Sequence, residues 1–202
     1  MSFGALFSVI NPLGTLPIFI GLTQGKEKRV ITETAIRTGA NMLIILTLSF
    51  FFGQYMLSFF GISIQSLKIA GGLIIASSGF ALLTGNFSKH KGMKEREKDD
   101  AFKRSDVSLT PLAMPMLAGP GSISLLISFH EQHQIFREQM TLVMAIVTTC
   151  VVTVSVLFSS RVIMKALGAS GINALSRIIG FIVISIGVEY ILSTILSILQ
   201  TA

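Results

Sequence analysis

The stretch 110–123 reads TPLAMPMLAGPGSI. Its first four residues, TPLA, are similar to NPLG at 11–14. All five prolines of the chain fall in the two apolar runs that contain these stretches, at positions 12, 17, 111, 115 and 120. A proline inside a helix removes a backbone donor and clashes with the preceding turn. Both regions are otherwise mainly apolar, so they predict two helices that are interrupted near their middle.

The composition of the whole chain indicates a membrane protein. Of its 202 residues, 51% are hydrophobic and 13% are charged, and the mean hydropathy is +0.75. An average soluble domain has roughly 25% charged residues, so this chain has too few charges to cover a globular surface. The single cysteine, Cys150, excludes a disulfide scaffold.

Apolar runs of about 20 residues, the length that crosses a hydrocarbon layer, predict six transmembrane helices. These runs cover 2–22, 38–60, 67–84, 107–129, 139–160 and 178–199. They lack the alternation of a β-barrel, so the predicted fold class is all-α, a polytopic membrane protein. We divide the chain into a three-helix half at 1–85, a charged connection at 86–106 and a second three-helix half at 107–202, which together form one membrane domain.

The distribution of lysine and arginine predicts the orientation in the membrane. Fourteen of the sixteen lie in the connections after the first, third and fifth runs, whereas Lys68 and Arg137 lie on the opposite side. Basic connections stay in the cytoplasm, so both termini are expected outside and the long basic loop 86–106 inside. The positive net charge therefore reflects topology and does not indicate a nucleic-acid partner.

The two halves of the sequence resemble each other. NPLG (11–14) corresponds to TPLA (110–113), an offset of 99, and LKIAG (67–71) corresponds to SRIIG (176–180), an offset of 109. Each half holds three helices, and three is an odd number, so the second half enters the membrane from the opposite face. We therefore expect a 3+3 inverted-topology repeat with discontinuous helices 1 and 4, an arrangement in which such helices mark a substrate site near the midplane.

Interrupted helices supply chemistry that suits a small zwitterion. The N-terminus of a half-helix offers unpaired N–H groups and a partial positive charge to a carboxylate. Unwound carbonyls suit an ammonium group, and Gly14, Gly119 and Gly121 let a ligand approach the main chain. The hydrogen-bonding side chains nearby are Asn11, Thr15, Thr110 and Ser122. The alternative is that proline and glycine only kink the helices for packing.

At these motifs the sequence resembles the MarC family of six-helix bacterial inner-membrane proteins. The similar pieces are NPLGTLPIF (11–19), FGISIQSLKIAGGLI (60–74), TPLAMPMLAGPGSI (110–123) and GINALSRIIGF with IGVEYIL (171–192). The resemblance implies a secondary transporter, with archaeal members that handle small neutral amino acids such as glycine and alanine. It implies substrate contacts at the unwound segments, namely Asn11, Pro12, Leu13, Gly14, Thr110, Pro111, Leu112, Ala113, Gly119, Pro120, Gly121 and Ser122.

Glu189 is the one formal charge well inside an apolar run, where an ionised carboxylate costs about 2.5–3.5 kcal/mol. Glu189 is therefore the candidate residue for coupling transport to protons. The alternative is a neutral Glu189 that is hydrogen-bonded to a neighbouring helix. The candidate coupling ions are a proton and sodium. Lys68 and Arg177 are expected to be snorkelling anchors or gate residues. His130 and His133 are expected in a loop, and we expect no metal site or cofactor.

Other function classes fit the residues less well. An aquaporin-like channel also pairs Asn-Pro half-helices, but here the second break begins with Thr-Pro and carries further prolines. A small-solute exporter of unknown substrate stays open. An intramembrane enzyme needs a nucleophile with a base, or paired carboxylates, at membrane depth, so we expect no enzyme. A purely structural subunit would leave the midplane breaks without a role.

Overall fold

The computed structural model describes residues 2–85 and 106–201, and within these the chain is all-helical. The helices are α1 (Ser2–Ile10), α2 (Pro12–Leu22), α3 (Lys28–Phe59), α4 (Ile64–Thr84), the π-helix η1 (Ser108–Leu117), α7 (Pro120–Gln132), α8 (Phe136–Phe158) and α9 (Ser160–Thr201). Five candidate membrane spans result, or six when η1 and α7, bent by 62°, count as one. The all-α membrane class is confirmed. The predicted connection 86–106 lies outside the described residues except for Asp106.

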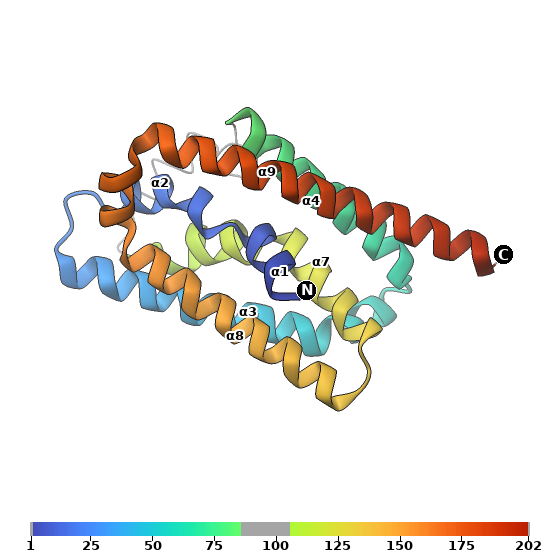
Figure 1. Ribbon diagram of the computed structural model, residues 1–202. Coiled ribbons are helices and arrows are strands. Elements are labelled where there is room, and N and C mark those ends of the chain that lie inside the picture. Colours follow the sequence, from blue (N-terminus) through green and yellow to red (C-terminus); the bar gives the residue numbers. More distant parts are fainter. Residues whose placement is uncertain (1, 86–105, 202) are drawn as a thin grey trace.

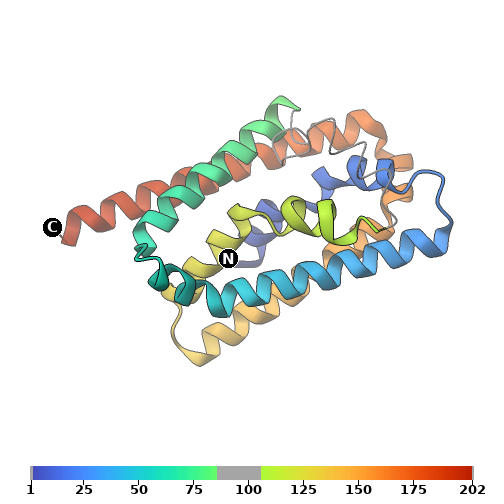
Figure 2. The same cartoon turned by 180° about the vertical axis from the view of Figure 1, so that it is seen from behind.

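Two broken segments, α1–α2 and η1–α7, lie at the centre of the bundle (Figure 1). Helices α3 and α8 flank them on one side, and α4 and α9 flank them on the other. The view from behind shows the same order (Figure 2). Packing contacts agree, because α1 touches α7 and α8, and α2 touches η1 and α9. The two proline-containing segments therefore lie between two pairs of longer helices.

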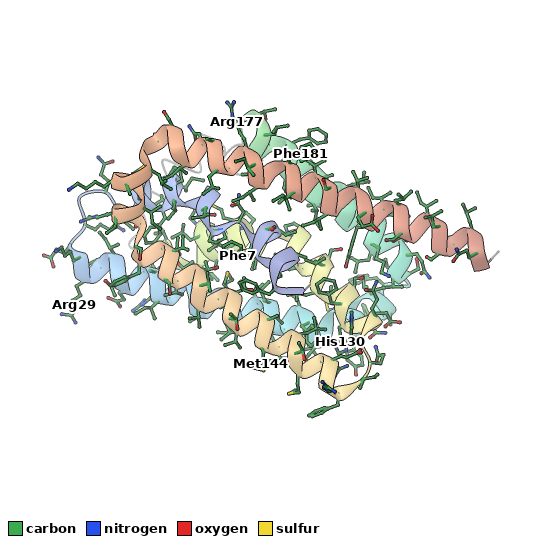
Figure 3. The ribbon with its side chains drawn as sticks, in the orientation of Figure 1. Phe7, Arg29, His130, Met144, Arg177 and Phe181 are labelled. Carbon is green, nitrogen blue, oxygen red and sulfur yellow. The ribbon has the colours of Figure 1, made fainter. Side chains whose placement is uncertain are left out.

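The core and the surface of the bundle are both apolar. Leu16 and Leu112 from the central segments are fully buried, as are Phe50 of α3 and Ile75 of α4. Outward-facing side chains such as Phe181 of α9 are also apolar, and this residue is 66% exposed (Figure 3). An apolar exterior of this kind suits hydrocarbon rather than water as its surroundings.

Helices α4 and α9 pack closely in antiparallel directions through glycines. A Cβ at Gly72 would lie 2.7 Å from the carbonyl oxygen of Gly187, and a Cβ at Gly79 would lie 2.7 Å from that of Gly180. Small residues let helix backbones approach in this way inside a membrane. Gly72 and Gly79 of α4 and Gly180 and Gly187 of α9 thus form the contact.

Several predicted boundaries are wrong. Helix α3 begins at Lys28, ten residues before the predicted start, because the charged turns 28–37 continue the helix beyond the apolar run. The segment 161–177, predicted as a connection, is helical and belongs to α9. No proline interrupts it, and the change of direction is made at Gly168, whose φ of 65° is accessible to glycine.

Candidate functional site

The first interruption lies at Asn11, between α1 and α2. Asn11 has a left-handed backbone (φ 49°, ψ 67°), and Pro12 follows at the first position of α2. The Gly14 N–H donates to Asn11 Oδ1 at 3.1 Å, so the asparagine side chain caps the new helix. The Thr15 hydroxyl donates to the Asn11 carbonyl oxygen at 3.3 Å. Asparagine is among the few residues that tolerate this backbone and cap a helix at the same time.

The second interruption extends from η1 to the start of α7. Thr110 and Met114 have extended backbones inside η1, as expected for residues that precede prolines. The chain bends by 62° before α7 begins at Pro120. The Ser122 hydroxyl donates to the carbonyl oxygens of Gly119 at 2.9 Å and Leu117 at 3.3 Å. The Gly119 carbonyl also accepts the Ile123 N–H at 3.1 Å, so the contribution of Ser122 to the break is a donor for the Leu117 carbonyl at the end of η1.

The two interruptions lie next to each other. A Cβ at Gly121 would lie 3.5 Å from Cγ1 of Val9, two residues before Asn11, and 3.0 Å from Ile75 Cγ1. Both α2 and α7 begin at the centre of the bundle (Figure 2). The first N–H groups of a helix have no partner within it and carry a partial positive charge. The fold therefore brings the start of α7 against the end of α1, just before the first interruption, in an apolar interior.

Polar side chains at this junction are closed off from the surface. Asn11 is 1% exposed, Thr15 is 0% and Ser122 is 2%. The Asn11 Nδ2 atom has no hydrogen-bond acceptor among the residues that the structure describes. A buried amide donor without a partner costs free energy, of the order of 1–3 kcal/mol. It is the feature of the junction that most calls for a ligand or a water molecule.

A cavity of about 200 Å³ lies beside the first interruption, between α2, α4 and α9. Gly14 forms part of its wall, and a Cβ there would lie 2.3 Å from Asn11 Nδ2 and 3.2 Å from Leu82 Cδ2. The Asn11 amide therefore lies directly behind the glycine. The residues around the cavity are Gly14, Pro17, Ile18, Leu82, Gly85, Asn173, Ser176 and Arg177. Asn173 and Ser176 were not singled out from the sequence.

The structure does not place all predicted site residues at the junction. Pro12, Pro111, Leu112, Ala113, Gly119 and Gly121 are buried with Asn11 and Ser122, and Leu13 and Gly14 are half-buried. Thr110 and Pro120 are on the exposed surface. Glu189 is also exposed, on the outer face of α9 about three turns beyond Arg177. Its role in proton coupling stays a prediction.

A second polar cluster lies at the opposite end of the bundle from Arg29 (Figure 3). The side-chain amide of Gln54 donates to the Glu131 carboxylate, which joins α3 to α7. The His130 ring contacts Phe50 edge-on, with 4.8 Å between ring centroids. The expectation that His130 lies in a loop is wrong, because α7 continues to Gln132 and His133 is its C-cap residue.

An ion-pair cluster connects α3 with the start of η1. Arg37 donates to Glu33 at 2.7 Å and to Asp106 at 3.3 Å. Asp106 also accepts the Ser108 backbone N–H at 2.8 Å. Hydrogen bonds from Ser108, and then the nearby Arg37, hold the pKa of Asp106 below its usual value. The cluster fixes the point at which the chain enters η1.

Comparisons with known proteins give a consistent family relationship. Residues 1–199 match the family described as "MarC family integral membrane protein". The UPF0056 inner membrane protein MarC of Escherichia coli (strain SMS-3-5 / SECEC) is 32% identical over 208 residues, which covers 97% of this chain and 93% of that protein. The UPF0056 membrane protein MJ1677 of Methanocaldococcus jannaschii is 31% identical over 195 residues, with 96% and 94% covered. No solved structure matches the chain.

Proposed function

This chain belongs to the MarC family of integral membrane proteins, and we propose that it is a secondary transporter for a small neutral solute. Small amino acids such as glycine and alanine are the preferred substrate class. The proposed location is the inner membrane, with both termini outside and the basic loop in the cytoplasm. The alternatives are a channel and an exporter of another small solute.

The observation that carries the proposal is the unpartnered Asn11 amide at a buried interruption that lies close to the start of α7. The Asn11 Nδ2 donor has no acceptor among the described residues, and Gly121, in the first turn of α7, packs near Val9, two residues before Asn11. Unpaired donors at a helix N-terminus in a low-dielectric site favour a carboxylate. Carbonyl oxygens of the interrupted segments suit the ammonium group of the same solute. A zwitterion is therefore the chemical class that fits best.

Internal symmetry supports alternating access as the mechanism. Gly72 and Gly79 of α4 are seven residues apart, as are Gly180 and Gly187 of α9, and each pair contacts the other in antiparallel order. Exchanging α4 with α9 maps the first glycine contact onto the second when Gly72 is equated with Gly180, an offset of 108 that differs by one residue from the offset of the sequence repeat. This agrees with the proposed inverted repeat, in which helices 1 and 4 are the discontinuous pair. Rocking of one half against the other would then expose the junction to each side in turn.

Counterflow in proteoliposomes tests the proposal. Vesicles preloaded with unlabelled alanine should accumulate external labelled alanine transiently above its equilibrium level, and the initial rate should saturate. The same measurement with glycine, and with a larger amino acid such as phenylalanine, defines the size limit. If no small amino acid produces saturable flux, the proposal is wrong.

Counterflow also separates a carrier from a channel. A channel has a continuous pore, so its flux does not saturate in this way and preloading does not drive accumulation. The buried side chains of Asn11, Thr15 and Ser122 close the junction in the present conformation, which favours a carrier. Flux that rises linearly with solute concentration, without counterflow, would favour the channel.

Proton coupling through Glu189 makes a separate prediction. The variant Glu189→Gln cannot bind and release a proton, so its transport should lose its dependence on a pH gradient while the protein still inserts and folds. Uptake is measured with and without an imposed pH gradient, in wild type and variant. An unchanged pH dependence in the variant would exclude the relay, and sodium would then be the coupling ion to test.

A further inference from the structure

The cavity beside the first interruption has one charged residue in its wall, Arg177. Arg177 lies in its wall, and among the described residues it has no carboxylate partner, since the ion pairs found there all involve Arg37. A guanidinium group without an anion is a ready partner for a carboxylate, which it binds with two hydrogen bonds. Arg177 is exposed at the rim of this cavity, where its guanidinium is accessible to a negatively charged group (Figure 3).

Two residues with hydrogen-bonding side chains share the cavity wall with Arg177 on α9. Asn173 and Ser176 precede Arg177 by four positions and one position, and all three contribute to the cavity wall. Residues three and four apart share a helix face, so Asn173 and Arg177 are neighbours there. Their side chains provide neutral donors and acceptors for a polar solute next to the charge.

The end of α4 supplies the opposite polarity. Gly85, the C-cap residue of α4, lies in the same cavity wall and has a left-handed backbone with φ 77°. The last carbonyl groups of a helix carry a partial negative charge and attract cations. A zwitterion thus finds a guanidinium for its carboxylate and a helix C-terminus for its ammonium group.

The position of the cavity indicates an entrance rather than the central site. It lies where α9 passes the end of α4, at the edge of the bundle where Arg177 is seen (Figure 3). Gly14 separates it from the buried Asn11 amide, which occupies the space where a Gly14 side chain would begin. The volume of about 200 Å³ is far above the ~10–15 Å³ that one water needs.

We propose that this cavity is the entrance of the carrier on the side of the loop 86–105, and that Arg177 binds the carboxylate of the incoming solute there. The inference deepens the proposed function and rests on it for the identity of the solute. Arg177 then acts as a substrate-contacting residue outside the junction. The solute would pass Gly14 to reach the Asn11 amide.

Thiol labelling tests the charge and the sidedness of the cavity without requiring transport. In a background with Cys150→Ala and Asn173→Cys, we measure modification rates with an anionic and a cationic methanethiosulfonate. Adding Arg177→Gln should lower the anionic-to-cationic rate ratio about tenfold, because one unit charge a few ångströms away is lost. The control Arg161→Gln removes an equal charge on the same helix and should change the ratio less than twofold. Labelling should occur only from the loop side.

Transport kinetics test whether the solute uses this site. Arg177→Gln should raise KM for alanine about tenfold with little change in kcat, Arg177→Lys should raise it less, and Arg161→Gln should leave it unchanged. An unchanged labelling ratio, labelling from the opposite side, or an unchanged KM in Arg177→Gln would each overturn the inference. If wild type shows no counterflow, the proposed function fails, and the labelling ratio still decides whether Arg177 forms an anion site.

Discussion

The two polar atoms of the Asn11 side chain have different surroundings at the first interruption. Its Oδ1 atom accepts the Gly14 N–H and caps α2, whereas its Nδ2 atom is buried without an acceptor among the described residues. An aspartate would cap α2 equally well but would supply no donor. The amide therefore does more than end a helix, and a solute carboxylate is the partner we propose for it.

Gly14→Ala tests the space beside Asn11. The added Cβ would lie 2.3 Å from Asn11 Nδ2, so the amide must move and the cap on α2 weakens. We expect transport to fall at least tenfold, with a loss of stability of about 1 kcal/mol from the cap. Counterflow and thermal unfolding measure the two effects. Gly4→Ala is the matched control, since nothing lies within 4 Å of its Cβ; wild-type transport by Gly14→Ala would contradict the prediction.

The lowered pKa of Asp106 predicts how the stability of the fold depends on pH. Because the folded protein holds the pKa of Asp106 below its unfolded value, the ionised carboxylate stabilises the fold above about pH 4. This contribution is lost as the pH falls through the lowered pKa. Asp106→Asn should therefore be less stable than wild type at pH 7, by less than about 1 kcal/mol because the Arg37 pair is exposed. The difference should vanish in acid.

Thermal unfolding of wild type and Asp106→Asn between pH 3 and pH 7 checks this sign. Glu27→Gln changes the net charge equally at a site outside the cluster and serves as the control. A difference between wild type and Asp106→Asn that grows toward acid would contradict the assigned contacts.

At the scale of elements, prolines and glycines made the interruptions predictable. Pro12 and Pro120 occupy the first positions of α2 and α7, where a missing N–H is tolerated. Thr110 and Met114 have extended backbones because each precedes a proline, whose ring disfavours the helical conformation of the residue before it. The bend at Gly168 was not predictable in the same way, because a lone glycine inside a helical pattern often continues the helix.

The outward or inward direction of side chains on α9 could not be derived from the sequence. Its residues are apolar on all sides, so no periodic stripe shows which face meets the protein. Glu189 consequently could not be assigned to the interior or the surface, and the structure places it on the surface. The cavity with Arg177 forms where α2, α4 and α9 meet. The spacing of residues along the sequence does not show which helices are neighbours, so this cavity could not be predicted.

Gly79→Ala tests the contact between α4 and α9. A Cβ at this position would lie 2.7 Å from the Gly180 carbonyl oxygen and from the Ile184 backbone nitrogen, and backbone atoms cannot move aside easily. We expect a loss of about 1–3 kcal/mol from overpacking, seen as a lower melting temperature in detergent. Gly4→Ala should show no such loss. A melting temperature equal to that of wild type would mean that the helices are not packed this closely.

At the scale of the whole molecule, four long helices flank two broken ones. Helices α3 and α8 lie on one side and α4 and α9 on the other, and Asn11, Thr15 and Ser122 are buried between them (Figure 1). The Ser122 hydroxyl donates to the Leu117 carbonyl at the end of η1. The remaining donor of Asn11 is the reason to regard the centre as a binding site rather than a packing defect.

The distance between a bound solute and Asn11 tests this claim most directly. The protein is reconstituted in lipid with ¹⁵N-labelled asparagine side chains, saturated with alanine carrying a ¹³C carboxylate, and examined by dipolar-recoupling solid-state NMR. A hydrogen bond from Nδ2 to the carboxylate places the two labelled atoms within about 4 Å. We predict a ¹³C–¹⁵N coupling of that size that disappears in Asn11→Ala. No coupling at saturating alanine, or a coupling that persists in Asn11→Ala, would contradict a solute site at the junction of the broken helices.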